Sequence, residues 1–198
     1  MTSPADPPLK RQRDAVQTRL DILRAAQRLF SRQGYMATGV RDIALEAGVS
    51  FALVRRYYGS KQGLLQAALE DMLHVAPLLD GDRATFGARA VALFIDRARE
   101  VTPVALMLLA SADPAGRALC QDILQRRILS PLADWLGGPD RHDRAARLQL
   151  LWTGFIATQQ ILALEQLAPD RVAQTRLWLE RISQAIADGA PVEELLPA

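Results

Sequence analysis

Residues 38–61 have the sequence TGVRDIALEAGVSFALVRRYYGSK. Four apolar residues in its first half have the i, i+3, i+4, i+7 spacing of a buried helix face: Val40, Ile43, Ala44 and Ala47. The pattern then stops at Gly48, which can adopt a positive φ, and Ser50 is a good N-cap for the segment that follows. Two helices of about eight residues joined by a three-residue turn predict a helix-turn-helix motif over about 39–58.

Helices are also expected on both sides of this motif. Upstream, apolar residues recur at helical spacing from about Val16 to Gln33, and Gly34 follows as a C-terminal cap. Thr38 is expected to cap the first motif helix, and Ser60 to cap a fourth helix that continues to about Ala76. The first residues are proline-rich and polar, so a disordered basic arm is expected over 1–14.

The rest of the chain also predicts helices, because helix-forming residues dominate and β-branched residues are sparse. Breaks are expected at Pro77–Arg83, Asp113-Pro114 and Gly137–Asp140, and a kink or break at Pro131. The helices expected between these breaks are 84–101, 103–112, 115–136, 141–167 and 169–188. The sequence thus predicts an all-α protein of about nine helices.

Charge is distributed unevenly along the chain. Residues 1–65 contain eleven Lys or Arg and five acidic residues, whereas the remainder contains thirteen basic and seventeen acidic residues. The first third therefore has a net charge of +6 and the rest of −4, although the whole chain has only +2. A cationic head on an acidic body is typical of a protein that binds a polyanion such as nucleic acid, although a solvated arginine-rich face would give the same balance.

The sequence does not contain the side-chain patterns of a catalytic or metal site. Cys120 is the single cysteine, which excludes an internal disulfide, and its apolar surroundings predict a buried small side chain. His74 and His142 have no Cys or His neighbour at ligand spacing. The acidic pairs Glu70-Asp71 and Glu193-Glu194 are expected on the surface, and no nucleophile or phosphate-loop motif is present. We therefore expect no metal, no cofactor and no enzymatic activity.

A cytoplasmic location is expected. No apolar run approaches the length of about 20 residues that a membrane-spanning helix needs. The N-terminal sequence MTSPADPPLKRQRD has no apolar core of the kind found in signal peptides.

About 50 residues of the N-terminal third match one family's pattern in a single register without a gap. These residues are Thr18-Arg19, Ile22-Leu23, Ala25-Ala26, Leu29-Phe30, Gly34-Tyr35, Thr38, Val40, Ile43-Ala44, Ala47–Ser50, Val54, Tyr57-Tyr58, Ser60-Lys61 and Leu64-Leu65. In this pattern the chain resembles the TetR family of transcriptional regulators. It departs from the family at Arg55, where an aromatic residue is common, and this changes the expected operator sequence. The resemblance implies a DNA-binding domain over 15–65 and a ligand-binding and dimerisation domain over 66–198.

The second motif helix is expected to enter the major groove, where its N-terminal half meets base edges. We expect Arg55 or Arg56 to pair with a guanine, although both could hold only phosphates. Ser50 and Thr38 are expected to bind phosphate at helix N-termini. The resemblance adds Tyr57 and Lys61 as phosphate contacts and Arg41 as a DNA contact. The complete set of expected DNA contacts is Thr38, Arg41, Ser50, Phe51, Ala52, Leu53, Arg55, Arg56, Tyr57 and Lys61.

The C-terminal part is expected to bind a ligand and a second copy of the chain. Helical regulators of the resembling family keep a cavity between these helices, and a mostly apolar wall suits a hydrophobic ligand. The candidate pocket residues, each of which also fits a plain core role, are Met72, Phe94, Met107, Trp135, Trp152, Phe155 and Gln159. The last two helices carry wide apolar faces that suggest an intermolecular four-helix bundle. These faces contain Leu148, Leu151, Phe155, Ile156, Ile161, Leu162, Val172, Leu177, Leu179, Ile182 and Ile186.

Together these features predict a homodimeric repressor that a small hydrophobic ligand releases from a palindromic operator. Transcriptional activation is an alternative. A sequence-tolerant architectural DNA-binding protein is another, although packaging DNA does not require a large apolar second domain. A helical enzyme with an incidental basic head is a third alternative, and no catalytic constellation supports it.

Overall fold

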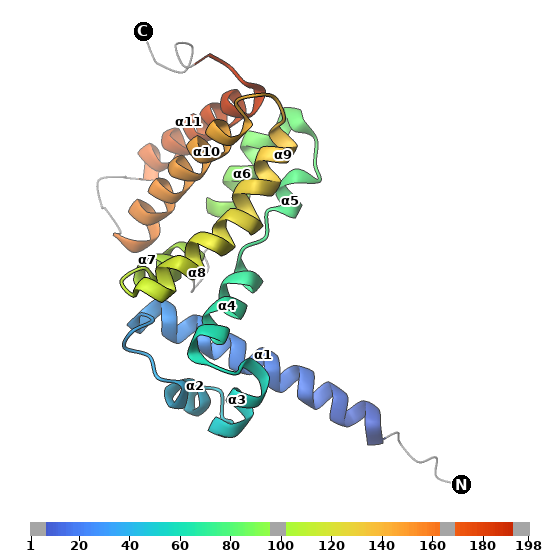
Figure 1. The fold of residues 1–198 in the computed structure, drawn as a ribbon. Coiled ribbons are helices and arrows are strands. Elements are labelled where there is room, and N and C mark those ends of the chain that lie inside the picture. The colour runs from blue at the N-terminus through green and yellow to red at the C-terminus, as the bar shows by residue number, and fades with distance from the viewer. Residues whose placement is uncertain (1–6, 96–101, 163–168, 192–198) are drawn as a thin grey trace. The chain divides into compact units, whose positions relative to one another are not determined.

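The computed structural model describes residues 7–95, 102–162 and 169–191, and every regular element in these ranges is helical (Figure 1). The elements are α1 (Pro7–Gln33), α2 (Val40–Glu46), α3 (Phe51–Tyr58), α4 (Lys61–Met72), α5 (Ala76–Leu79), the 3₁₀ turn η1 (Arg83–Thr85), α6 (Phe86–Ile95), α7 (Pro103–Ala110), α8 (Pro114–Leu124), the π segment η2 (Gln125–Leu129), α9 (Ser130–Leu136), α10 (Arg141–Ile156), the π segment η3 (Ala157–Ile161) and α11 (Pro169–Asp188). The predicted all-α fold is confirmed. If α8 and α9 are counted as one continuous helix and one-turn α5 is left aside, the described residues form the expected nine helices.

The chain forms two compact units. Of the described residues, 7–72 and 106–120 make up the first unit, and 73–95, 102–105, 121–162 and 169–191 make up the second. The sequence-based boundary at residue 65 instead gave every later residue to one domain. The segment 106–120 packs with the N-terminal helices, and a Cβ added to Gly34 would lie 3.8 Å from the Cβ of Leu109. Local sequence patterns do not predict such a contact, because its partners are far apart in the chain.

The core of the first unit is built from the apolar faces of α1 to α4. Four large apolar side chains of α1, α2 and α3 are buried in this core: Leu23, Phe30, Ile43 and Val54. Further fully buried residues of the same unit are Ile22, Leu64, Leu65, Leu69 and Leu106. Burial of apolar surface on this scale is the main stabilising contribution in a small helical unit.

The helix α1 begins earlier than the sequence pattern predicted. It runs from Pro7 to Gln33, so residues 7–14 are helical where a disordered arm was expected, while residues 1–6 lie outside the described structure. The prediction relied on apolar periodicity, which begins at Val16. Proline is well tolerated in the first turn of a helix, and the Lys, Arg and Gln residues that follow are good helix formers. Intrinsic helix propensity thus accounts for the longer helix.

The helix α4 is shorter than predicted, and the break after it is partly helical. It ends at Met72 instead of continuing to about Ala76, and Ala76–Leu79 then forms the one-turn helix α5. Pro77 lies in the first turn of α5, where its missing N–H leaves no helical hydrogen bond unmade. Proline therefore starts a helical turn here, whereas the prediction treated it only as a breaker.

In the second unit α6 approaches α11 closely at Gly87. A Cβ added to Gly87 would lie 2.1 Å from the main-chain oxygen of Glu180, and the Gly87 N–H donates to Gln184 Oε1 at 2.9 Å. Nearby, Trp152 of α10 donates through Nε1 to the Oγ of Ser183 at 3.0 Å, and both residues are buried. A residue without a side chain at position 87 thus allows the two helices to pack at this short distance.

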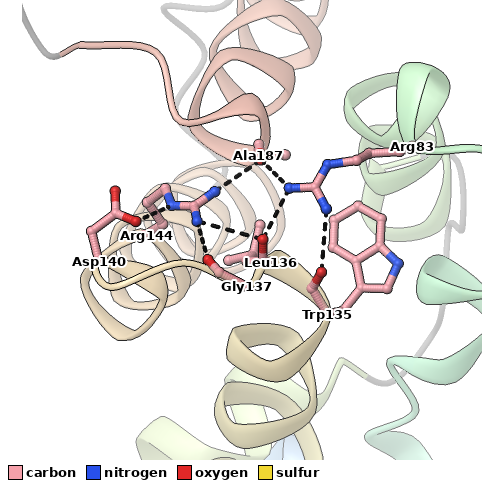
Figure 2. Close-up of polar contacts among 7 residues, drawn as sticks. All are labelled: Arg83, Trp135, Leu136, Gly137, Asp140, Arg144 and Ala187. Carbon is pink, nitrogen blue, oxygen red and sulfur yellow. Dashed lines mark hydrogen bonds and ion pairs between the residues drawn. The ribbon is translucent and has the colours of Figure 1, made fainter.

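Two arginines cap the C-terminal ends of α9 and α11 (Figure 2). The guanidinium groups of Arg83 and Arg144 both donate to the main-chain oxygen of Ala187, at 2.7 Å and 3.0 Å. Both also reach carbonyl groups at the end of α9, and Arg144 is further paired with Asp140 at 3.0 Å. The last carbonyl groups of a helix have no partner within it and carry partial negative charge. The two cations therefore stabilise both helix ends.

The irregularity predicted at Pro131 is present just before that residue. Residues Gln125–Leu129 form a π segment, and the Ser130 N–H donates to the Gln125 carbonyl instead of continuing the α pattern. Proline has no N–H to donate to the residue four positions earlier, so the helical hydrogen-bond ladder must change near it. A second π segment, Ala157–Ile161, follows α10, and the end of the predicted helix 141–167 lies outside the described residues.

The apolar faces of the last two helices are divided between the core and the surface. Four residues expected on an intermolecular face are instead buried within the second unit: Leu148, Ile156, Leu179 and Ile186. Other large apolar side chains on these helices or just after them are exposed: Leu150, Ile161, Leu162, Leu177 and Trp178. The last two helices thus carry more apolar surface than the core of their own unit buries. The prediction of an intermolecular face was wrong for the four buried residues.

We expect Gly87→Ala to destabilise the protein by about 1–3 kcal/mol, because the added methyl group would collide with the backbone of α11. The matched control is Gly154→Ala, since a Cβ there meets nothing within 4 Å. Alanine favours a helix interior over glycine, so the control should be neutral or more stable by up to about 1 kcal/mol. Urea unfolding followed by circular dichroism measures both changes, and equal effects of the two substitutions would contradict this account of Gly87.

Candidate nucleic-acid interface

The predicted helix-turn-helix is formed by α2 and α3. In the turn between them Gly48 has a φ of +65°, and the N–H of Val49 donates to the Ala44 carbonyl at 2.9 Å. Ser50 caps α3, because its Oγ accepts a hydrogen bond from the Leu53 N–H at 3.3 Å. The positive φ and the serine cap expected at these positions are confirmed.

One side of α3 is buried and the opposite side is exposed. Val54 is buried, Leu53 and Tyr57 are half-buried, and the exposed residues are Phe51, Ala52, Arg55 and Arg56. Their spacing places the exposed residues on one strip of the helix surface. The strip presents two guanidinium groups on a recognition helix, which is the arrangement used for contacts in the major groove.

The exposed surface continues onto α2 through Arg41 and Leu45. These residues are four positions apart and therefore share one helix face. The guanidinium carbon of Arg41 lies 5.9 Å from the ring centroid of Phe51, so a cation–π contact joins the two motif helices. Leu45 is 83% exposed and was not among the predicted contacts. The one indication in the sequence was that Leu45 is apolar but does not belong to the predicted buried face of this helix.

Tyr58 fixes the C-terminal end of α3 to α1. Its hydroxyl donates to the main-chain oxygen of Arg19 at 2.7 Å, and the guanidinium carbon of Arg19 lies 5.8 Å from the centroid of its ring. Burial raises the pKa of Tyr58 above its usual value, against the lowering effect of Arg19, so the hydroxyl keeps the proton that it donates. Tyr58 is thus a half-buried anchor of the recognition helix.

The predicted cap at Thr38 is wrong, because Gly39 is the N-cap of α2. Thr38 is 1% exposed, and its hydroxyl donates to the main-chain oxygen of Gly34 at 2.8 Å. The N–H of Gly39 donates to the carboxylate of Asp42 at 2.8 Å, which places a negative charge at this helix end. The buried hydroxyl and the neighbouring carboxylate both disfavour the phosphate contact that was expected of Thr38.

Lys61 is held at the start of α4 by groups from the turn after α1. Its Nζ donates to the main-chain oxygen of Met36 at 3.2 Å and lies 4.5 Å from the ring centroid of Tyr35. Lys61 was predicted from the family resemblance, whereas the two groups that hold it were not predicted. Tyr35 followed the expected helix cap in the sequence, but nothing in the pattern indicated which side chain its ring would face.

The candidate pocket residues are divided between the two units. Met72 and Met107 are half-buried in the first unit, and Trp135, Trp152 and Phe155 belong to the second. Trp135 stacks on Phe86 with 4.7 Å between ring centroids, and the Arg83 guanidinium carbon lies 4.7 Å from its ring centroid. The side chains of Phe94 and Gln159 lie outside the described structure. Ligand contact by these residues stays a prediction.

The described residues form neither a metal site nor a membrane-spanning helix. In that part of the chain no three His, Cys, Asp or Glu side chains gather as a metal site requires. No helix in the described ranges is long and apolar enough to cross a membrane. Cys120 is buried as predicted, and burial raises the pKa of its thiol to about 11.

A helix-turn-helix with an exposed, arginine-bearing recognition helix defines the class of DNA-binding transcriptional regulators. A family model described as "Bacterial regulatory proteins, tetR family" matches residues 22–68, and one described as "Tetracyclin repressor-like, C-terminal domain" matches residues 84–186. The chain belongs to the TetR family, as its sequence resemblance predicted. Members of this family are DNA-binding transcription factors and not enzymes.

Individual relatives agree with this assignment. The HTH-type transcriptional regulator HbdR of Aromatoleum sp. (strain CIB) is 31% identical over 127 residues, which cover 59% of this chain and 53% of HbdR. The HTH-type transcriptional repressor Rv3405c of Mycobacterium tuberculosis is 43% identical over 51 residues, or 26% of this chain and 27% of that protein. The chain thus spans about half the length of HbdR in this match and about a quarter of Rv3405c.

A solved structure extends the similarity to most of the chain. The TetR-family regulator SCO0857 of Streptomyces coelicolor A3 superposes with a TM-score of 0.56 at 27% identity. The match covers 87% of this chain and 95% of that structure.

Proposed function

We propose that this protein is a homodimeric repressor that binds a palindromic operator and is released from it by a small hydrophobic ligand. The observation that carries the proposal is the exposed strip of α3, where Arg55 and Arg56 lie next to each other on the side opposite buried Val54. An arginine side chain pairs bidentately with the O6 and N7 atoms of guanine. Repression is supported by the name of the relative Rv3405c, a transcriptional repressor that is 43% identical over 51 residues.

The proposed DNA contacts are divided by the part of DNA that they meet. Arg55 and Arg56 contact base edges, and Phe51 or Ala52 contacts the methyl group of a thymine. The remaining contacts position the protein on the phosphate backbone and carry no sequence information directly. These positioning residues are Arg41, Ser50, Tyr57 and Lys61, and Leu53 is a predicted DNA contact whose half-buried apolar side chain has no phosphate-binding group.

The homodimer is proposed to form through α10 and α11. Support comes from the large apolar side chains that these helices leave exposed, above all Leu150, Leu177 and Trp178. Trp178 is 50% exposed, and exposed tryptophan is uncommon on a surface that stays in water. A two-fold dimer would cover these side chains and present two recognition helices to the two half-sites of an inverted repeat.

The release step is proposed to follow from linkage between two binding equilibria. A ligand releases DNA only if it binds the DNA-incompetent dimer more tightly than the competent one. The candidate pocket residues are mostly apolar, which supports a hydrophobic or aromatic ligand.

We expect Arg55→Ala and Arg56→Ala to change base preference, because a lost guanine contact removes discrimination at one operator position at a cost of about 1–3 kcal/mol. Selection from randomised inverted repeats, followed by sequencing, measures the preference of each variant. Arg127→Ala is the matched control, since Arg127 is an exposed arginine outside both the first unit and the two helices of the proposed dimer interface. If both variants select the same operator as the wild type, these arginines do not contact bases.

We expect the protein to elute as a dimer of its 21.8 kDa chain at micromolar concentration, and Trp178→Glu to shift it to monomer. A buried carboxylate at an apolar interface is strongly unfavourable. Leu45→Glu is the control, because it puts the same charge on an exposed apolar position of α2. Size-exclusion chromatography with light scattering gives the masses. A monomeric wild type, or a Trp178→Glu variant that remains dimeric, would refute the proposed interface.

We expect operator DNA to weaken ligand binding by about 5–150-fold, the usual range for coupled sites. Apolar and aromatic compounds are first screened by thermal shift, and the best compound is then titrated calorimetrically into the protein with and without the selected operator. As a control, the compound is titrated into the protein in the presence of an unrelated DNA duplex. Equal ligand affinities with and without operator would leave a DNA-binding protein that the compound does not regulate.

A further inference from the structure

Lys61 is one of only two lysines in the chain, which uses arginine at 22 of its 24 cationic positions. Its ammonium group lies over the ring of Tyr35, 4.5 Å from the centroid, and donates to the main-chain oxygen of Met36 at 3.2 Å. An ammonium group has three N–H donors, so two remain for an acceptor beyond this turn. A compact point charge fits this position, whereas a planar guanidinium group has a different donor geometry.

The position of the Tyr35 ring is itself fixed by packing in the core. It is buried and lies against Phe30, with 5.4 Å between ring centroids and an angle of 57° between the ring planes. Phe30 is fully buried in α1. The ring therefore cannot turn away from Lys61 without disturbing the core of the first unit.

The corner between α7 and α8 also contacts this turn. Leu109 of α7 lies against Gly34, and a Cβ added to that glycine would be 3.8 Å from the Cβ of Leu109. Asp113 caps α8 by accepting from the Gly116 N–H at 2.7 Å. Burial raises the pKa of Tyr35, and the charge of Asp113 raises it further, so the ring carries a neutral hydroxyl. All of these residues belong to the first unit.

We propose that Tyr35 is a positioning residue for DNA binding, whose ring, packed against Phe30, directs the ammonium group of Lys61 toward a DNA phosphate. The proposal rests on the operator binding proposed above. A lysine side chain is flexible, and binding is weakened when that flexibility must be lost on contact with DNA. A side chain that is already oriented in the unbound protein avoids this loss.

The test is the salt dependence of binding to the operator duplex selected by the wild-type protein. Each phosphate neutralised contributes about 0.9 to the slope of log K against log salt. We expect Lys61→Met and Tyr35→Leu each to lower the slope by about this amount, and the double variant to lower it no further. Tyr35→Phe keeps the ring face and should keep the wild-type slope. We expect an affinity loss of about 3–10-fold for Tyr35→Leu at moderate salt, in line with the energy of one oriented cation–π contact.

A second measurement does not depend on whether Tyr35→Leu folds well. Lysine labelled with ¹³C at the ε position gives two signals in the wild-type protein, and Lys61→Met identifies the one from Lys61. Because Lys61 lies over an aromatic face, we expect its signal to be shifted upfield in the unbound wild type and in Tyr35→Phe. We also expect it to change again when the operator duplex is added.

The outcomes separate this proposal from the proposed function. If the wild-type protein selects no operator, the proposed function itself is contradicted. An operator bound with unchanged salt slopes in Tyr35→Leu, or equal behaviour of the Leu and Phe variants, would overturn the role of Tyr35 alone. An unshifted Lys61 signal in the unbound protein would also overturn it.

Discussion

Burial of one apolar face of α3 is the constraint on which the DNA-facing surface depends. With Val54 enclosed in the first unit, the 3.6-residue period of the helix leaves Arg55 and Arg56 exposed. Burying a valine side chain contributes about 1.5–3 kcal/mol, which is enough to fix the rotation of a helix this short. The Ser50 cap and the Tyr58 hydrogen bond then fix its two ends.

Polar side chains in both units bind the main-chain groups that helices leave without partners. In the first unit Asp42 and Asp113 accept hydrogen bonds from N–H groups at helix starts. In the second, Arg83 and Arg144 donate to carbonyl groups at helix ends. Buried main-chain polar groups without partners are costly, so short helices joined by tight turns require such contacts.

The boundary between the two family models does not coincide with the boundary between the two compact units. Residues 106–120 lie within the C-terminal model's match over 84–186, yet they pack with the helices that carry the DNA-binding motif. Leu109 against Gly34 is the clearest such contact. A change at Leu109 therefore alters the surroundings of the turn after α1 directly, through packed side chains.

Sequence alone determined the helix-turn-helix, because its signals are local: the buried-face spacing that includes Ile43, the glycine at the turn and the serine cap. Local propensity also explains why all described elements are helical. Only the tertiary structure decided which residues support that motif, since the partners of Lys61 and Tyr58 come from distant segments. It also placed Thr38 inside the core. Periodicity specifies which face of a helix is apolar, and the packing of the whole chain specifies what that face meets.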